Sequence, residues 1–226
     1  NADTINKALK EGKNLLLTPG IYTLDKPITV EEKDTIIYGM GLATLVSTNG
    51  NACMVTSDAD GIKVCGVLFE AGDKQSETLL KVGNEKAEVS HSDNPICFSD
   101  VYFRVGGANY KGKVKNCVTI NSNDVIGDNF WVWRADHGDN VGWDMNTAPN
   151  GIVINGDNVT MYGLFVEHFQ EYQTIWNGNG GKLYFYQSEM PYDAPNQKYY
   201  MSHNGKVKGY ASFKIGDEVN DFYGCG

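Results

Sequence analysis

Residues 62–70, with the sequence Ile-Lys-Val-Cys-Gly-Val-Leu-Phe-Glu, contain the pattern that decides the fold. β-Branched or apolar residues are followed by a small or polar residue and then by an apolar pair. The pattern recurs along the 226-residue chain, with segments of variable length between its copies. Taking Ile62 as the first position, the other copies start at Thr35, Ile96, Val125, Val159 and Gly181, with a weaker copy at Val219. Such repetition is a stronger guide to architecture than the propensity of any one segment.

The shortest interval between two copies, from Val159 to Gly181, is 22 residues. A unit of this length built from short strands suits one coil of a right-handed parallel β-helix, and longer intervals place the additional residues in loops. The sequence therefore predicts an all-β fold, a right-handed single-stranded parallel β-helix. An ordinary antiparallel sandwich is the alternative, because its strands also recur at about 8 to 12 residues.

The expected organisation is a single β-helix domain over residues 1–226. Residues 1–34 would form the N-terminal cap and the first strands, and residues 35–226 would form the coils. Segments that exceed the repeat unit are expected to be long loops, at 71–93, 136–149 and 190–209.

Both ends of the chain carry signals of their own. Ala2–Lys10 is expected to form a short helix that caps the solenoid, with Asp3 as its N-cap residue. Residues 222–226 lie in an apolar strand pattern that would leave an exposed sheet edge. We therefore expect the chain to be part of a longer protein.

The charge balance restricts the partners of the protein. Its 28 acidic and 19 basic residues give a net charge of −9, which disfavours nucleic acid and anionic lipid surfaces. The chain has only two arginines, Arg104 and Arg134, which disfavours a site that binds phosphate or uronate groups through several arginines. The sequence contains no run of about 18 apolar residues, the length that a membrane-spanning helix needs. We expect a neutral ligand, with no nucleic-acid or membrane partner.

Cysteine and metal-ligand patterns are uninformative about catalysis. The five cysteines are odd in number and lie in apolar runs, which is typical of free thiols that pack as small hydrophobic side chains. His137 and His168 each adjoin an acidic residue, but no recognised metal-ligand spacing is present. We expect no disulfide framework, no metal and no cofactor.

The ninth position of each repeat gives the candidate site. Equivalent positions on successive coils of a β-helix stack about 4.8 Å apart, the spacing of paired strands. The ninth residues are polar or aromatic throughout, and we expect them to form an outward-facing column of Glu70, Arg104, Trp133, Glu167 and Glu189.

Glu167 and Glu189 are 22 residues apart and should be neighbours on successive coils. Two adjacent carboxylates are not easily ionised together, so one is expected to hold its proton. A protonated carboxyl beside an ionised one suits cleavage of a glycosidic bond. His168 is expected to orient Glu167. The alternative is that the column is simply a solvated face without catalytic function.

Aromatic residues near the two glutamates suggest a sugar ligand. Flat rings stack on the faces of pyranose rings, and four tryptophans lie within reach along the sequence. The candidate platform consists of Trp131, Trp133, Trp143 and Trp176.

Three segments containing these residues resemble bacterial members of glycoside hydrolase family 55: residues 125–138, 163–168 and 186–193. That family consists of exo-acting β-1,3-glucanases, or laminarinases, in which two tandem β-helices enclose the active site. The resemblance implies a pectate-lyase-like solenoid, a neutral β-glucan substrate and a secreted, extracellular protein. It covers the second β-helix only, so a further β-helix domain or chain would be needed to complete the cleft.

The same resemblance implies roles for individual residues. Glu189 corresponds to the general acid, and Glu167 corresponds to the carboxylate that organises the water network. Tyr192 corresponds to a hydroxyl that reaches the terminal glucose. The resemblance also implies inversion at the anomeric carbon, which spacing alone does not reveal.

Two other functions are compatible with a β-helix. One is a non-catalytic carbohydrate-binding or structural domain, which would use the aromatic face and tolerate changes at both glutamates. The other is a polysaccharide lyase, which needs a basic residue and usually calcium. Arg134 with Asp136, Asp139 and Asp144 would then be the candidates.

Overall fold

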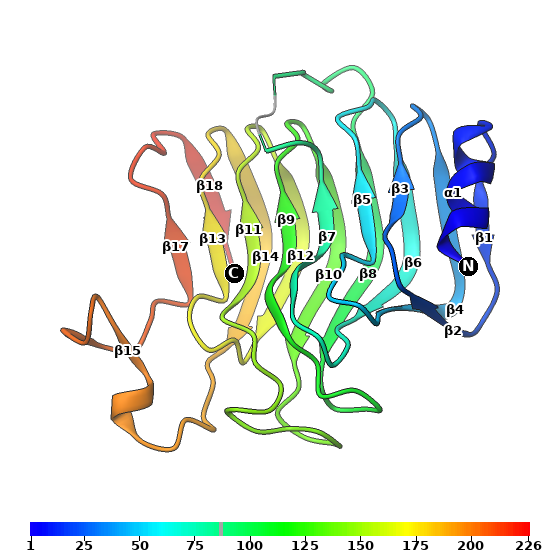
Figure 1. Ribbon diagram of the computed structural model, residues 1–226. Coiled ribbons are helices and arrows are strands. Elements are labelled where there is room, and N and C mark those ends of the chain that lie inside the picture. The colour runs from blue at the N-terminus through cyan, green and yellow to red at the C-terminus, as the bar shows by residue number, and fades with distance from the viewer. Residues whose placement is uncertain (86–87) are drawn as a thin grey trace.

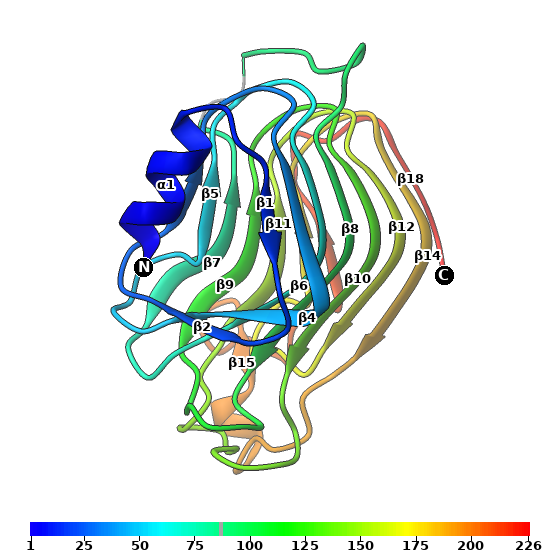
Figure 2. The same cartoon turned by 90° about the vertical axis from the view of Figure 1, so that its right-hand side faces the viewer.

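The computed structural model describes residues 1–85 and 88–226 and forms a solenoid of stacked coils (Figure 1). Two sheets face one another, and the chain passes between them in each coil (Figure 2). We call the nine-stranded sheet A and the seven-stranded sheet B. Every strand pair found within these two sheets is parallel. The predicted parallel β-helix is confirmed, and the antiparallel sandwich is wrong.

The strands of sheet A are β1 (Leu15–Leu17), β2 (Ile21–Leu24), β4 (Ile36–Ser47), β6 (Lys63–Glu70), β8 (Cys97–Val105), β10 (Ile126–Arg134), β12 (Thr160–Glu167), β14 (Gly181–Glu189) and β18 (Phe222–Cys225). Those of sheet B are β3 (Ile28–Val30), β5 (Met54–Thr56), β7 (Ser76–Val82), β9 (Val114–Ile120), β11 (Asn150–Ile154), β13 (Thr174–Trp176) and β17 (Phe213–Ile215).

The core consists of apolar columns that run from coil to coil. One column, fully buried and in register from β6 to β12, contains Val67, Val101, Phe130 and Leu164. Beside it, the rings of Phe69 and Phe103 stack with centroids 4.9 Å apart. Each coil therefore buries its apolar side chains against its neighbours, which is the usual source of stability in a solenoid.

A bend in the sheet-A strands determines which side chains face outward. In five of the seven copies of the repeat, the fifth residue has a φ angle between 52° and 71°, namely Gly66, Asp100, Asn129, Gly163 and Phe185. Glycine, asparagine and aspartate adopt this left-handed conformation more readily than other residues, which explains the small or polar position in the pattern. The bend uses one residue and resets the two-residue alternation. As a result, the ninth residue is directed away from the core.

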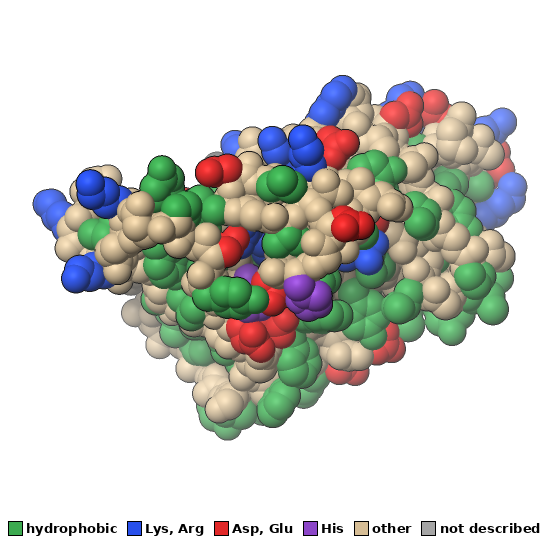
Figure 3. Space-filling model, turned by 90° about the horizontal axis from the view of Figure 1, so that it is seen from below, with side chains coloured by type: hydrophobic (Ala, Val, Ile, Leu, Met, Phe, Trp, Pro, Cys, Tyr) green, Lys and Arg blue, Asp and Glu red, His purple; other side chains and the backbone are tan. Residues whose placement is uncertain are grey.

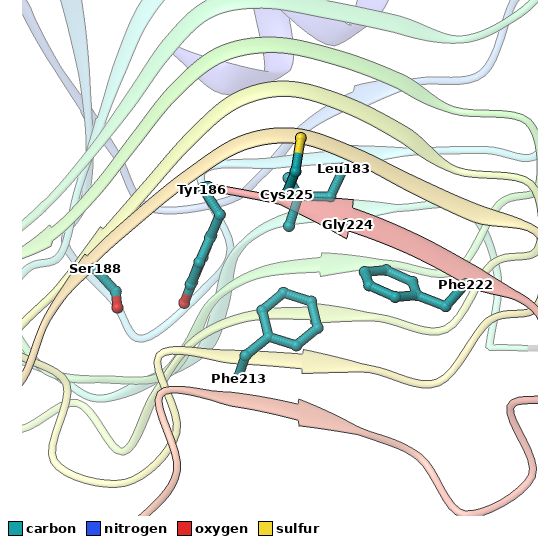
Figure 4. Close-up of a pocket in the computed structure, with 8 residues that line it drawn as sticks. Leu183, Tyr186, Ser188, Phe213, Phe222, Gly224 and Cys225 are labelled. Atoms are coloured by element: carbon teal, nitrogen blue, oxygen red, sulfur yellow. The ribbon is translucent and has the colours of Figure 1, made fainter.

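The two ends of the solenoid differ. Helix α1 (Ala2–Lys10) covers the first coil with buried Ala2 and Leu9, as predicted. Its N-cap residue is Asn1, whose side chain accepts a hydrogen bond from the Thr4 N–H, so the prediction of Asp3 is wrong. At the last coil, a hollow of about 380 Å³ lies between Tyr186, Phe213 and Phe222 (Figure 4).

The predicted loops are only partly loops. Segment 71–93 contains strand β7, and its residues 86 and 87 lie outside the described residues. Segment 136–149 contains no strand in the structure. Segment 190–209 contains a 3₁₀ turn (Gln197–Tyr199) and a hairpin of β15 (Met201–Ser202) and β16 (Val207–Lys208). The loops around the candidate site therefore have more internal structure than predicted.

All five cysteines are free thiols, as expected. Cys53 and Cys117 are buried, whereas Cys225 is exposed and does not pack as a core residue. Over residues 1–85 and 88–226, no helix has both the length and the apolar character needed to cross a bilayer.

Candidate active site

Residues at the C-terminal ends of five sheet-A strands form the column that the repeat predicts. Pairing joins Glu70 to Arg104, Arg104 to Trp133, Trp133 to Glu167 and Glu167 to Glu189. Neighbouring strands of a parallel sheet lie about 4.8 Å apart. Glu167 and Glu189 are therefore adjacent across one coil, which confirms the interpretation of their 22-residue spacing.

This column is not open along its whole length. Glu70 is 2% exposed and accepts a 2.9 Å hydrogen bond from Nη2 of Arg104. The prediction that Glu70 faces solvent is wrong, because the Arg104 side chain of the next coil covers it. Exposure increases towards Glu167, which is half-buried, and Glu189, whose side chain is 56% exposed. Seen from below, acidic and histidine side chains gather beside hydrophobic ones (Figure 3).

Two tryptophans of β10 lie beside Glu167. The indole rings of Trp131 and Trp133 stack with centroids 5.3 Å apart and an interplanar angle of 19°. Trp131 is 41% exposed, and its Nε1 donates a 2.9 Å hydrogen bond to Oε2 of Glu167. This bond positions the carboxylate against an accessible aromatic surface. Such a surface suits the apolar face of a sugar ring.

The His168 ring contacts Glu189, the glutamate of the following coil. His168 is 3% exposed, and its Nε2 lies 3.4 Å from Oε2 of Glu189. The other carboxyl oxygen, Oε1, accepts a 3.3 Å hydrogen bond from Nε2 of Gln187. The expectation that His168 orients Glu167 is thus wrong, because the ring reaches the following coil.

Asp136 connects several side chains of the site, a role that the sequence did not predict. It accepts hydrogen bonds from Trp133 Nε1, at 3.2 Å, and from the Tyr192 hydroxyl. Burial raises the pKa of the carboxyl, but hydrogen bonds from Tyr192, from its own backbone N–H and from His137 outweigh this effect and lower the pKa to about 2. Asp136 is therefore a fixed anion that fastens Tyr192 beside the tryptophans.

Tyr192 is 69% exposed, and its ring meets that of His168 edge to face with centroids 5.3 Å apart. Its hydrogen bond to Asp136 raises the pKa of the phenol above its ordinary value. The hydroxyl therefore stays protonated at neutral pH, and the accessible ring is in a position to meet a ligand.

Arg134 is fully buried and holds two loops of the site together. Its guanidinium makes a bidentate pair with Asp193, with distances of 3.0 and 2.7 Å. It also donates to the carbonyl oxygens of Gly142, Asn146 and His168. An arginine saturated in this way is unavailable as the base of a lyase. No three possible metal ligands cluster in the described part of the chain, so Asp136, Asp139 and Asp144 do not converge.

The remaining two predicted tryptophans lie elsewhere. Trp176 is fully buried and in register with Ile154, so its assignment as a ligand-binding residue is wrong. Trp143 lies under Arg134, whose guanidinium carbon is 5.6 Å from the ring centroid, and meets Tyr200 edge to face. It supports the loop anchored by Arg134.

Residues 1–189 match the family described as the LAM55 pectate lyase-like domain. The chain belongs to the LAM55 family. This finding confirms the resemblance to glycoside hydrolase family 55. The LAM55 chain is 47% identical over 225 residues to an exo-beta-1,3-glucanase of Streptomyces sp. strain SirexAA-E, a match that covers 100% of this chain and 37% of that protein.

Solved structures from the same organism show the same fold. The structure of sacteLam55A matches with a TM-score of 0.95 and 46% identity, over 99% of this LAM55 chain and 40% of that chain. An ensemble refinement of a sacteLam55A variant in complex with glucose matches with a TM-score of 0.93 and 46% identity, over 97% and 39% of the two chains. The present chain thus spans well under half the length of these relatives.

Proposed function

We propose that this site hydrolyses β-1,3-glucosidic bonds and releases glucose from the ends of a neutral β-glucan. The observation that carries the proposal is the register pair of Glu167 and Glu189, placed on an accessible wall beside the indoles of Trp131 and Trp133. Paired carboxyl groups are what glycoside hydrolysis requires. The relationship to a protein named exo-beta-1,3-glucanase supports the choice of linkage and of chain-end attack.

Glu189 is the proposed general acid. It donates a proton to the glycosidic oxygen, which takes the electron pair of the breaking C–O bond. Its exposed carboxyl is accessible to a bound sugar, whereas Glu167 is half-buried and held by Trp131. Glu167 is therefore better suited to orient the attacking water than to donate a proton to the leaving group. Direct attack by this water inverts the anomeric carbon.

Tyr192 and the tryptophan pair would hold the terminal glucose. The Tyr192 ring is exposed on one side of the glutamates, and the Trp131 ring is exposed beside Glu167. We assign the stacking of the sugar ring to Trp131 and Trp133, and a contact to a terminal hydroxyl group to Tyr192.

We also propose that a second β-helix domain or chain completes the cleft. The candidate site lies on an exposed face of the solenoid, and the match covers 37% of the length of the Streptomyces relative. A polysaccharide substrate further supports an extracellular location, because such polymers are too large to be processed inside the cell without prior cleavage.

The direct test is hydrolysis of laminari-oligosaccharides by the protein in the longest form that its gene encodes. The proposal predicts that glucose is the first product and that NMR detects it initially as the α-anomer. A β-anomer would contradict inversion. Tight binding without any hydrolysis would instead support the carbohydrate-binding alternative, and a new ultraviolet-absorbing product would support a lyase.

A further inference from the structure

His137 is an exposed histidine that is nevertheless held in one place beside the tryptophans of β10. Its side chain is 78% exposed. The imidazole ring lies against the indole of Trp133, with centroids 5.2 Å apart and an angle of 51° between the ring planes. Because Trp133 pairs in register with Glu167, His137 lies at the rim of the surface on which the proposed function places the sugar. The roles proposed for its neighbours leave this side chain without a function.

The segment that follows His137 is fastened to the preceding coil. The N–H of Gly107 donates a 2.8 Å hydrogen bond to the carbonyl of Asp139. The side-chain amide of Asn140 donates one of 2.7 Å to the carbonyl of the residue after Gly107. Gly138 has a φ angle of 95°, and a Cβ at this position would overlap the carbonyl oxygen of Gly107. The loop therefore packs backbone against backbone, which fixes the position of the histidine before any ligand binds.

The two nitrogens of the His137 ring have different surroundings. Nδ1 lies 2.8 Å from Oδ1 of Asp136. Although burial opposes it, hydrogen bonds from Tyr192 and other neighbours lower the pKa of Asp136 to about 2, so this carboxyl is ionised at neutral pH. A carboxylate can only accept hydrogen bonds, and Nδ1 therefore carries a hydrogen in both the neutral and the charged ring. Within the described residues, Nε2 makes no hydrogen bond.

A fixed ring with one unoccupied nitrogen suits a ligand that carries hydroxyl groups. Nε2 accepts a hydrogen bond when the ring is neutral and donates one when the ring is charged. A hydroxyl group complements either state, because it can both donate and accept. Holding the ring in advance also avoids the loss of side-chain entropy that binding would otherwise cause.

We propose that His137 binds a hydroxyl group of the glucan through Nε2, while Asp136 holds the ring through Nδ1. The sugar concerned is the one that lies against the tryptophans. This inference rests on the proposed function, and it assigns His137 to binding, with no part in proton transfer. The competing explanation is that the ring only supports Trp133, as any flat side chain would.

Substitutions at His137 separate the two ring nitrogens. His137→Asn can keep the hydrogen bond to Asp136 but does not reach the position of Nε2, whereas His137→Gln places an amide near that position. His137→Phe keeps only the flat ring. We expect the asparagine and phenylalanine variants to raise KM for laminaritriose by about 3- to 10-fold, the effect of one neutral hydrogen bond, with kcat nearly unchanged. The glutamine variant should lose less.

The protein in the longest form that its gene encodes is used for these measurements. Kd is measured by calorimetry in the Glu189→Gln background, so that the proposed cleavage does not consume the ligand, and it should rise by the same factor as KM. His203→Gln, at an exposed position in the β15–β16 hairpin, is the control. A phenylalanine variant that binds like the unmodified protein would overturn the proposal, because a supporting ring would then suffice.

Deoxy sugars test the contact itself. Laminaribiose derivatives that each lack one hydroxyl group are titrated into the Glu189→Gln protein with and without His137→Asn. The proposal predicts that one derivative binds more weakly to the protein with His137, but loses little further affinity when His137 is replaced. Both changes remove the same hydrogen bond, so their effects are not additive. Additive effects for every derivative would contradict a contact between Nε2 and the sugar.

The outcomes separate this inference from the proposed function. If the unmodified protein binds laminaritriose without hydrolysing it, the hydrolytic function is wrong, and the Kd values still decide the role of His137. If the protein hydrolyses laminaritriose and the asparagine and phenylalanine variants keep its KM and Kd, the function stands and the assignment of His137 is wrong. A fall in kcat with an unchanged KM would also overturn the assignment, because it would place His137 in the chemical step.

Discussion

Arg134 is the residue on which the arrangement of the site loops most depends. A fully buried guanidinium is tolerated only when carboxylates and carbonyl oxygens satisfy its donors. Here Asp193 supplies both carboxylate oxygens, and backbone carbonyls supply the rest. Since Asp193 follows Tyr192 directly, the same ion pair restrains the position of Tyr192, which we propose contacts the sugar.

Removing the carboxylate should therefore be costly. We expect Asp193→Ala to lower the free energy of unfolding by about 3 kcal/mol, because it leaves a buried charge without its partner. Urea denaturation measures the change, with the exposed Asp217→Ala as the matched control. A loss no larger than that of the control would show that the carbonyl oxygens alone satisfy Arg134.

Trp131 is expected to contribute binding energy to the sugar. Trp131→Ala removes the accessible ring. It should raise the Kd for laminaritriose by about tenfold or less, the range expected for one aromatic contact. Trp131→Phe keeps a ring but loses the hydrogen bond to Glu167, so it should bind more tightly than the alanine variant. Calorimetric titration measures both. Tyr38→Ala, at an exposed aromatic position on β4, should bind like the unmodified protein; an equal loss there would contradict a localised platform.

The predictability of these residues from the sequence was uneven. Glu167 and Glu189 could be paired because one coil has a countable length. The same count places Trp176 one coil after Ile154, in a core column, so the burial of Trp176 also follows from the spacing. By contrast, the contact of His168 depends on a left-handed backbone and on the next coil, which no spacing reveals.

At the level of the elements, the bend shared by β6, β8, β10, β12 and β14 connects the repeat pattern to the candidate site. It converts a pattern that would point every odd position inward into one that directs the ninth residue outward. Gly66 and Gly163 occupy equivalent bend positions with φ angles of 71° and 68°. Their surroundings differ. A Cβ at Gly66 would overlap the carbonyl oxygen of Gly39, whereas one at Gly163 would make only ordinary van der Waals contacts, the nearest of them to the Phe165 ring at 3.6 Å.

These two glycines make a matched pair for mutagenesis. Gly163→Ala should cost about 1–2 kcal/mol of unfolding free energy, the price of a left-handed alanine. Gly66→Ala should cost about 1–3 kcal/mol more, because the backbone of the preceding coil must also shift. Denaturant unfolding of the two variants provides the comparison. Equal effects would mean that the coils separate easily at this point.

Loop structure was the least predictable feature. Strand β7 lies within a segment predicted as a loop, although its alternating residues were visible in the sequence. The role of Asp136 arises from the contact between segments 136–149 and 190–209, which are far apart along the chain. Repeat spacing predicts the coils, but it says nothing about how insertions fold against one another.

At the scale of the whole molecule, hydrogen bonds centred on His91 connect turns of different coils at the end of the sheet-A strands opposite Glu189. His91 is 1% exposed and lies between two aspartates, with Nδ1 2.6 Å from Asp60 and Nε2 2.9 Å from Asp58. Ser122 donates a further 2.6 Å hydrogen bond to Asp58, and Asp124 accepts one from the His91 N–H. Burial disfavours the charged ring, but the hydrogen bonds and charges of Asp58 and Asp60 outweigh it and raise the pKa of His91.

This cluster predicts a pH-dependent stability. Because the pKa of His91 is higher in the folded state, the stabilisation is complete below about pH 6.5, the unfolded value, and is lost as the pH rises through the folded value. The excess unfolding free energy of the unmodified protein over His91→Gln should therefore decrease from acidic to alkaline pH. An excess that grows with pH would contradict the charged cluster. His203→Gln controls for the loss of an exposed histidine.

The most direct test of the whole account is the turnover of Glu189→Gln on laminaritriose, measured together with its Kd and with Glu77→Gln on sheet B as the control. If Glu189 is the acid of a glucan-cleaving site, kcat falls by about 10²- to 10⁴-fold while binding is nearly unchanged and the control remains fully active. A Glu189→Gln variant that keeps its kcat would contradict the assignment of this wall as a hydrolytic site.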